Sequence, residues 1–406
     1  MQRTVEAHRD AVLSGIDPLP PFDLALLDAR GCRLAADVRS PIALPSFSSA
    51  ACEGFAVRVA DCASASAVAP ARLLVVDAVM PGDRPRRAVV PGAAVRVRLG
   101  SALPEGTEAV IPADEVDAQG DWIAIDAPIG SGAHMRPAGV EFAAGDVVLP
   151  RGARIDARRI ALLASAGIGR VHAHPRPRVV IITVGDELVE PGAALLPGMV
   201  SDSNGVMLSA LVQQLGAVAY RVGPVADDPA TFEQVLADQM VRADLIVVAG
   251  GVSASSYETV LEVANRLGSM EIHRVSMTPG AAQGFGRLGD DGIPMLTLPG
   301  YPAAAFVSFE TFVGPVIRRM AGADAVEPAA IRAELLAGVR SLPGRRQFIP
   351  SVRVPGADGV LRVRPLHSEH ATAELAQADC LLVVPEMVEH LVPGDIVDVY
   401  AFGTAA

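Results

Sequence analysis

The sequence predicts a multidomain α/β protein in which a doubly wound domain is combined with smaller β-rich domains. Between residues 178 and 320, short β-type runs alternate with helical stretches, the pattern of repeated βα units around a mostly parallel sheet. Residues 56–135 and 327–406 instead contain short β-runs separated by Gly and Pro, which is typical of small barrels. A chain of 406 residues can bury several hydrophobic cores.

The doubly wound part has strands and helices in regular alternation. The predicted order is strand 179–183, helix 205–215, strand 218–222, helix 231–240, strand 245–249, helix 256–267, strand 295–298 and helix 303–320. The loops that follow the strands, at Gly185–Glu187, Ala249–Ser253 and Pro299–Pro302, should meet at the carboxyl edge of the sheet, where such domains bind ligands. Backbone N–H groups near Gly250-Gly251 can bind a phosphate there.

The whole chain divides into five predicted regions. These are an N-terminal helix that packs on the α/β domain (1–22), a linking α+β domain (23–44 and 136–176), a β-barrel-like domain (45–135), the doubly wound domain (177–325) and a C-terminal β domain (326–406). Thr4 and Asp156 are the predicted N-caps of helices over residues 4–13 and 157–166.

The stretch Val179–Asn204 is the most informative part of the sequence. A strand ends at Val184-Gly185, the acidic pair Asp186-Glu187 follows, and Ser201–Asn204 opens a helix after a Gly/Pro-rich turn. This arrangement is typical of a ligand site at the carboxyl end of a strand. The alternative is a simple turn at Gly185 with solvated acids.

Composition excludes several functional classes. The net charge of −12 disfavours nucleic acid and anionic membranes as partners. No apolar run is long enough to span a membrane, and four scattered cysteines fit neither a disulfide framework nor a zinc site, so we expect a cytoplasmic protein. All 34 basic residues are arginine, which excludes chemistry that needs a lysine.

Several segments together resemble a known family. They are LPSFSSAACEGFAVR from Leu44, LGSALPEGTEAVIPADEV from Leu99, RPRVVIITVGDELVEPG from Arg176, and then SDSN, DDP, AGGVS, TPG and LPGYPAA. Their order and spacing over nearly the whole chain resemble the molybdopterin molybdenumtransferase family of molybdenum cofactor biosynthesis. The resemblance implies an elongated homodimer of four-domain subunits, whose doubly wound domain binds molybdopterin. The implied reaction inserts molybdate into adenylylated molybdopterin, releases AMP and is assisted by Mg²⁺; the implied partner is the molybdopterin adenylyltransferase.

The resemblance also assigns roles by position. It implies that Glu53, Glu187 and Asp227 are catalytic, and that Glu187 and Asp227 bind the metal. The other matching positions are expected to bind the adenylylated molybdopterin or molybdate. They are Thr183, Gly185, Asp186, Asp202, Asn204, Gly250, Gly251, Ser253, Ser256, Pro299, Pro302, Arg345 and Ser368.

The sequence departs from the family pattern mainly at charged positions. Glu53 replaces an aspartate, Ser256 stands where an aspartate is expected, and Thr278–Ala281 lacks both lysines of a Lys-Pro-Gly-Lys stretch. Arg274 and Arg287 are the arginines that can replace part of the lost positive charge. Two hypotheses follow: an active transferase with a divergent site, or a catalytically impaired relative that acts as a molybdopterin-binding carrier or regulatory module.

Overall fold

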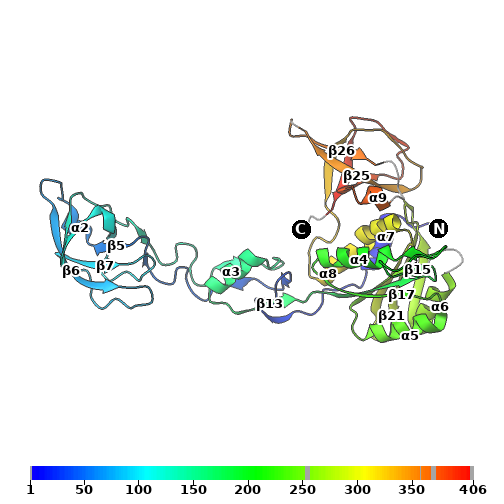
Figure 1. Cartoon of the computed structure of the whole chain (residues 1–406), viewed down its shortest axis with the longest axis horizontal. Coiled ribbons are helices and arrows are strands. Elements are labelled where there is room, and N and C mark those ends of the chain that lie inside the picture. The colour runs from blue at the N-terminus through cyan, green and yellow to red at the C-terminus, as the bar shows by residue number, and fades with distance from the viewer. Residues whose placement is uncertain (1, 252–256, 357, 367–371, 403–406) are drawn as a thin grey trace. The chain divides into compact units, whose positions relative to one another are not determined.

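The computed structural model describes residues 2–251, 257–356, 358–366 and 372–402 (Figure 1). The chain forms two compact units. The first contains Met1–Phe22, Gly31–Ala35 and His172–Ala406, and the second contains Asp23–Arg30 and Ala36–Val171. None of the described helices is both long enough and apolar enough to cross a membrane.

The first unit is built on a six-stranded sheet. In spatial order its strands are β17 (Val218–Val225), β14 (Arg178–Val184), β18 (Leu245–Gly250), β22 (Ile293–Leu298), β21 (Ala282–Leu288) and β19 (Gly268–Arg274). The first four are parallel, and β21 runs antiparallel to both of its neighbours. The mostly parallel sheet predicted from the sequence is therefore confirmed, while β19 and β21 were not predicted.

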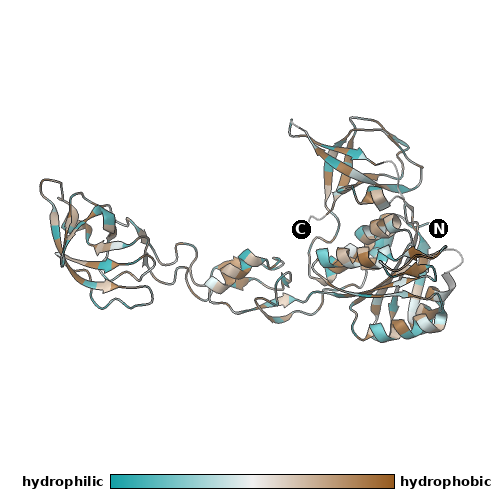
Figure 2. Cartoon of the chain, viewed as in Figure 1, coloured by the Kyte–Doolittle hydropathy of each residue, from teal (hydrophilic) through white to brown (hydrophobic). Residues whose placement is uncertain are grey.

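Helices cover both faces of this sheet, as a doubly wound fold requires. Helices α4 (Ser203–Gln214) and α7 (Pro302–Ser308) lie on one face, and α5 (Pro229–Met240) and α6 (Tyr257–Leu267) lie on the other (Figure 1). Successive residues of β14 point to opposite faces of the sheet. Ile181 therefore belongs to the hydrophobic core under α4 and α7, and Ile182 to the core under α5 and α6. Figure 2 shows hydrophobic and hydrophilic residues side by side on these helices, as expected where one face packs and the other is solvated.

The last predicted helix of this unit is interrupted. A π-helical segment, η2 (Phe309–Val313), separates α7 from α8 (Gly314–Met320). Pro315 lies in the first turn of α8 and has no N–H group, so it cannot continue the regular hydrogen-bond ladder. The N-terminal helix α1 (Val5–Leu13) packs against η2 and α8, and Thr4 accepts a hydrogen bond from the N–H of Ala7 as its N-cap.

The C-terminal strands of the first unit close into a small barrel. Its strands, in order, are β25 (Arg346–Pro355), β26 (Leu361–Pro365), β23 (Ala330–Leu335), β29 (Ile396–Ala401) and β27 (Cys380–Val384), and β27 pairs back with β25. Strand β20 (Met277–Thr278) pairs with the start of β25. The short pair β24 (Val339–Arg340) and β28 (His390–Leu391) and helix α9 (Thr372–Leu375) complete this part.

The second unit contains a separate six-stranded sheet. Its order is β8 (Ala109–Pro112), β5 (Gly54–Val57), β7 (Ala93–Val97), β6 (Ala71–Val79), β10 (Trp122–Ile125) and β9 (Asp117–Gln119). Its core includes Phe55, Leu73, Ile111 and Ile123. Helices α2 (Val59–Cys62) and α3 (Ala157–Ser165) and the turn η1 (Ala113–Glu115) also lie here. Asp156 caps α3 as predicted, by accepting a hydrogen bond from the N–H of Arg159.

Short strands make up the remaining sheets. These are β1 (Phe22–Ala25), β13 (Arg170–His174) and β2 (Arg33–Leu34) in one sheet, and three pairs: β11 (Met135–Arg136) with β4 (Ser49–Ala50), β12 (Val147–Leu149) with β3 (Val38–Arg39), and β15 (Leu188–Val189) with β16 (Val200–Ser201).

Candidate functional site

The carboxyl edge of the parallel sheet is where the topology predicts a site. From β14 the chain first adds β17 on one side and then adds β18 on the other, which makes β14 the switch point of the sheet. Val184 lies opposite Gly250, and Ala249 lies opposite Leu298, so β14, β18 and β22 end at the same level. The loops that follow these three strands therefore meet at one edge, as the sequence predicted.

A buried carboxylate organises this edge. Asp202 is 1% exposed and is the N-cap of α4, where its Oδ1 accepts from the N–H of Gly205 at 2.9 Å. Its Oδ2 accepts from the hydroxyl of Thr183 at 2.8 Å and from Nη2 of Arg221 at 2.9 Å. A buried carboxylate is stable only when its oxygens are paired in this way. Asp202 and Thr183 thus join the start of α4 to the end of β14.

The acidic loop after β14 lies beside the loop after β17. The N–H of Gly185 donates to the carbonyl of Val225 at 3.0 Å, and Oδ1 of Asp186 accepts from the N–H of Asp227 at 3.0 Å. The carboxylate of Glu187 folds back over Gly185, because a Cβ on residue 185 would lie 2.6 Å from Oε2 of Glu187. The structure therefore brings Gly185, Asp186, Glu187 and Asp227 to one corner of the edge.

A second contact joins α4 to the loop after β22. Nδ2 of Asn204 donates to the carbonyl of Gly300 at 2.6 Å, and Gly300 lies between the predicted site residues Pro299 and Pro302. Pro302 begins α7, at a position where a missing N–H costs nothing. Oδ1 of Asn204 is buried and has no hydrogen-bond partner within the described residues, so it remains able to accept one.

Gly250, at the end of β18, lies close against the backbone of β14. Its φ is +89°, and a Cβ at this position would lie 2.3 Å from the carbonyl oxygen of Val184. Gly251, with a φ of +65°, continues the left-handed backbone. Only glycine fits such a conformation next to a neighbouring strand.

Substitution of Gly250 by alanine should separate the ends of β14 and β18 and cost about 3 kcal/mol, because strain and a steric clash add. Gly192 is a matched control: its φ is +92°, but no atom lies within 4 Å of its Cβ position. Alanine at 192 should cost about 1 kcal/mol, from backbone strain alone. Hydrogen exchange of the β14 and β18 amides measures both effects, and equal protection in the two variants would contradict the predicted clash.

The other predicted site residues do not join this cluster in the described structure. Ser253, Ser256 and Ser368 lie outside the described residues. Glu53 belongs to the second unit, where it pairs with Arg98 at 2.7 Å and Arg96 at 3.5 Å, so its place relative to Glu187 stays a prediction.

Arg345 lies just before barrel strand β25, and its side chain makes no hydrogen bond or ion pair with another described residue. The next residue, Arg346, pairs with Glu6 and Glu386. Arg345 therefore has a free guanidinium among the described side chains, but no contact places it in the strand-end cluster.

The arginines expected to replace the lost lysines have other positions. Arg287 lies opposite Pro294 at the amino end of β22, away from the strand-end site, and donates to the carbonyls of Gly15 and Gly292. Arg287 therefore does not replace the lost cations there. Arg274 is exposed at the end of the outer strand β19.

The cation that does reach the predicted site is Arg221, which sequence reasoning missed. The sequence did contain a signal for it: Arg221 is a charged residue within a predicted strand of a parallel sheet, and such a residue needs a partner of opposite charge.

The acidic loops supply two carboxylates of the kind that magnesium binds, from Glu187 and Asp227. Oδ1 of Asp227 is buried and has no hydrogen-bond partner among the described residues, which leaves it able to coordinate a cation. In the described part of the chain, no three or more His, Cys, Asp or Glu side chains are grouped so that they alone could hold a metal ion. Mg²⁺ usually takes one or two protein carboxylates and completes its shell with water and substrate phosphates.

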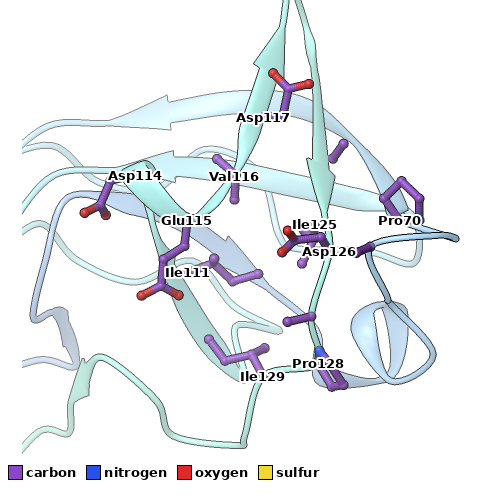
Figure 3. Close-up of a pocket in the computed structure, with 13 residues that line it drawn as sticks. Pro70, Ile111, Asp114, Glu115, Val116, Asp117, Ile125, Asp126, Pro128 and Ile129 are labelled. Carbon is purple, nitrogen blue, oxygen red and sulfur yellow. The ribbon is translucent and has the colours of Figure 1, made fainter.

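A cavity of about 640 Å³ lies elsewhere, in the second unit (Figure 3). Its apolar wall includes Ile111, Ile125 and Ile129. Four carboxylates also line it, from Asp114, Glu115, Asp117 and Asp126, and all four residues are exposed. It contains none of the predicted site residues, and its exposed acids do not require a ligand. The strand-end cluster, with its buried polar groups, is therefore the candidate site.

Comparison with known proteins gives the same assignment along the chain. Three family models match in succession: the MoeA N-terminal region (domain I and II) over residues 3–167, a probable molybdopterin binding domain over 180–319, and the MoeA C-terminal region (domain IV) over 332–402. Molybdopterin molybdenumtransferases 1 and 2 of Mycobacterium tuberculosis are 34% and 35% identical to this chain, cover 98% of it, and match over 98% and 99% of their own lengths. The crystal structure of a molybdopterin biosynthesis MoeA protein from Pyrococcus horikoshii, at 28% identity, superposes with a TM-score of 0.83 and covers 99% of both chains. The chain therefore belongs to the molybdopterin molybdenumtransferase family.

Proposed function

We propose that this protein is an enzyme of molybdenum cofactor biosynthesis that inserts molybdate into adenylylated molybdopterin and releases AMP. The observation that carries the proposal is the polar cluster at the carboxyl edge of the sheet, where Thr183, Asp186, Glu187, Asp202 and Asn204 surround the switch point. The full-length relatives named molybdopterin molybdenumtransferase support the same activity. They do not favour the alternative of a catalytically impaired carrier.

The roles of the residues follow from their chemistry. The backbone N–H groups near Gly250 and Gly251 can bind a phosphate of the substrate, and the unpaired Oδ1 of Asn204 can accept a hydrogen bond from the pterin. Glu187 and Asp227 would hold Mg²⁺, which when bound offsets the negative charge of the phosphates. Asp202 is buried and fully paired, so its role is to fix the start of α4 rather than to react.

Molybdate is the second substrate, and it needs positive charge or N–H donors. The proposed anion site contains Arg345 and Ser368, and Glu53 is the third proposed catalytic carboxylate. We further propose that the enzyme is a cytoplasmic homodimer that receives its substrate from the molybdopterin adenylyltransferase.

Replacement of Glu187 by glutamine or alanine tests the proposal. Turnover should fall roughly 10²-fold or more, as is typical when a group that stabilises or protonates the transition state is lost. The measurement follows AMP release and molybdenum incorporation with adenylylated molybdopterin, molybdate and Mg²⁺. Glu262→Gln is the control, because this exposed carboxylate of α6 pairs with Arg266 at the protein surface and with no other side chain that the structure describes.

The outcomes separate the two hypotheses. Wild-type protein that binds the pterin but releases no AMP would support the carrier hypothesis and contradict the enzyme hypothesis. Full activity of both Glu187 variants would show that the catalytic carboxylate lies elsewhere.

A further inference from the structure

Arg221 makes an unusual pair of contacts from the middle of strand β17. Its Nη2 donates to Oδ2 of Asp202 at 2.9 Å and to Oε2 of Glu190 at 2.9 Å. The Asp202 side chain is 1% exposed and that of Glu190 is 54% exposed, so one guanidinium nitrogen joins a buried carboxylate to a surface carboxylate.

The two carboxylates mark the ends of one chain segment, Glu190–Asp202. Glu190 follows strand β15 directly, and Asp202 follows strand β16 directly. Between them the segment is exposed and Gly/Pro-rich, and Leu195 and Leu196 are 57% and 65% exposed. Apart from the β15–β16 pairing, Arg221 is the side chain that ties both ends of this segment to the sheet.

Glu187 depends on the same segment. Its carbonyl accepts from the N–H of Val200 at 2.8 Å, and the N–H of Asp202 donates to the carbonyl of Val189 at 2.9 Å. A shift of β16 would therefore move the backbone of Glu187. Because Asp202 also begins α4, it would move Asn204 as well.

The surroundings of Arg221 are built to admit a guanidinium. A Cβ on residue 205 would lie 2.7 Å from Nε of Arg221, so Gly205 leaves the space through which this side chain passes. The guanidinium is also always charged and ends a longer side chain than the ammonium of lysine, so its Nη2 can reach both carboxylates from the middle of β17.

We propose that Arg221 is a positioning residue for the transferase reaction. It holds the two ends of Glu190–Asp202 on the sheet and so fixes Glu187 on one side and Asn204 on the other. This inference rests on the proposed function, because the importance of Glu187 comes from it. The carboxylates of Asp202 and Glu190 accept from Nη2 of Arg221, while its Nε is buried without a hydrogen-bond partner among the described residues.

Three single variants and one double variant separate the contact of Arg221 with Glu190 from its contact with Asp202. Glu190→Ala removes only the contact between Arg221 and the surface carboxylate. The kcat should fall about tenfold, while KM for adenylylated molybdopterin changes less than about twofold. Arg221→Met removes the contacts with both Glu190 and Asp202, and kcat should fall about 10²-fold. The lysine side chain is shorter than that of arginine, so Arg221→Lys should keep the contact with the buried Asp202, lose the contact with the surface Glu190 and match Glu190→Ala. The Glu190→Ala/Arg221→Met double variant should be no slower than Arg221→Met alone, because the two changes remove one shared contact.

Hydrogen exchange supplies a readout that needs no turnover. Amides of residues 190–201 should exchange faster in all the variants that break the Glu190 contact. Arg178→Met is the matched control, because Arg178 pairs with Asp244 at 2.8 Å in the same sheet, at the amino end of β14. It should leave both the exchange of residues 190–201 and kcat unchanged.

The outcomes that overturn the proposal are distinct from those that overturn the function. Unchanged exchange and unchanged kcat in Glu190→Ala and Arg221→Lys would show that the segment is not held by Arg221. An equal loss of kcat in Arg178→Met and Arg221→Met would show that Arg221 acts only through the general stability of the sheet. If the wild-type protein shows no turnover but the Arg221 variants still exchange faster at residues 190–201, the proposed function is contradicted and the role of Arg221 in holding the segment is retained.

Discussion

Replacement of Asp202 by alanine should lower the free energy of unfolding of the α/β part by about 3 kcal/mol, the lower end of the range for breaking a buried ion pair. The substitution removes the N-cap of α4, leaves the hydroxyl of Thr183 without its acceptor, and leaves Arg221 with only its surface partner Glu190. Arg221 is 25% exposed, so water can solvate part of its charge. For this reason we expect the lower end of the range.

The single tryptophan gives this experiment an internal reference. Trp122 lies in the second unit, so its fluorescence reports unfolding there, whereas hydrogen exchange of α4 and β14 reports the first unit. Asp202→Ala should speed exchange in α4 and β14 and leave the tryptophan transition unchanged. Asp228→Ala is the matched control: Asp228 is also an N-cap, of α5, but it is exposed, and its partners among the described residues are the N–H and the hydroxyl of Thr231. Equal effects of the two substitutions would show that the buried contacts of Asp202 add no stability.

The local features of the site could be predicted from sequence because they depend on neighbouring residues. The run of β-branched residues that ends at Gly185 forms β14, and the Ser-Asp-Ser-Asn stretch places Asp202 at the N-cap of α4. The sequence also placed Gly250-Gly251 at the end of a strand, although the left-handed backbone there is a finding of the structure. Each of these signals acts over a few residues, where propensity and capping decide the conformation.

Features that depend on register could not be predicted in the same way. Arg221 reaches Asp202 only because β17 pairs with β14 so that Arg221 lies opposite Ile181. The closure of the C-terminal barrel depends on the pairing of β27 with β25, which joins residues far apart in sequence. Arg287 was placed wrongly for the same reason, since β21 runs antiparallel and carries it to the other end of the sheet. Charge alone does not reveal at which edge a side chain lies.

One buried histidine lies outside the site and connects the N-terminal helix to the α/β core. His8 of α1 is 1% exposed, and its ring packs edge-on against Phe312 of η2 at a centroid distance of 4.9 Å. Neither ring nitrogen has a hydrogen-bond partner among the described residues. Burial, followed by the positive charges of His273 and Arg3, lowers the pKa of His8 to about 4. Glu271 contacts both His273 and Arg3, so it weakens but does not remove their effect.

The packing of α1 should therefore weaken as the pH falls. Above pH 6.5, His8 is neutral in the folded and unfolded chains, and the stability is complete. Below it the unfolded chain binds a proton that the folded chain excludes, so about 2 kcal/mol should be lost by pH 5 and more as the pH approaches the folded pKa of about 4. After correction for the intrinsic effect of pH, this corresponds to roughly 30-fold faster hydrogen exchange of the α1 amides at pH 5. His8→Leu should remove the dependence without loss of a hydrogen bond, whereas His390→Leu, at an exposed position in β28, should retain it. The same pH profile in wild type and His8→Leu would show that another group, and not His8, controls the stability of α1.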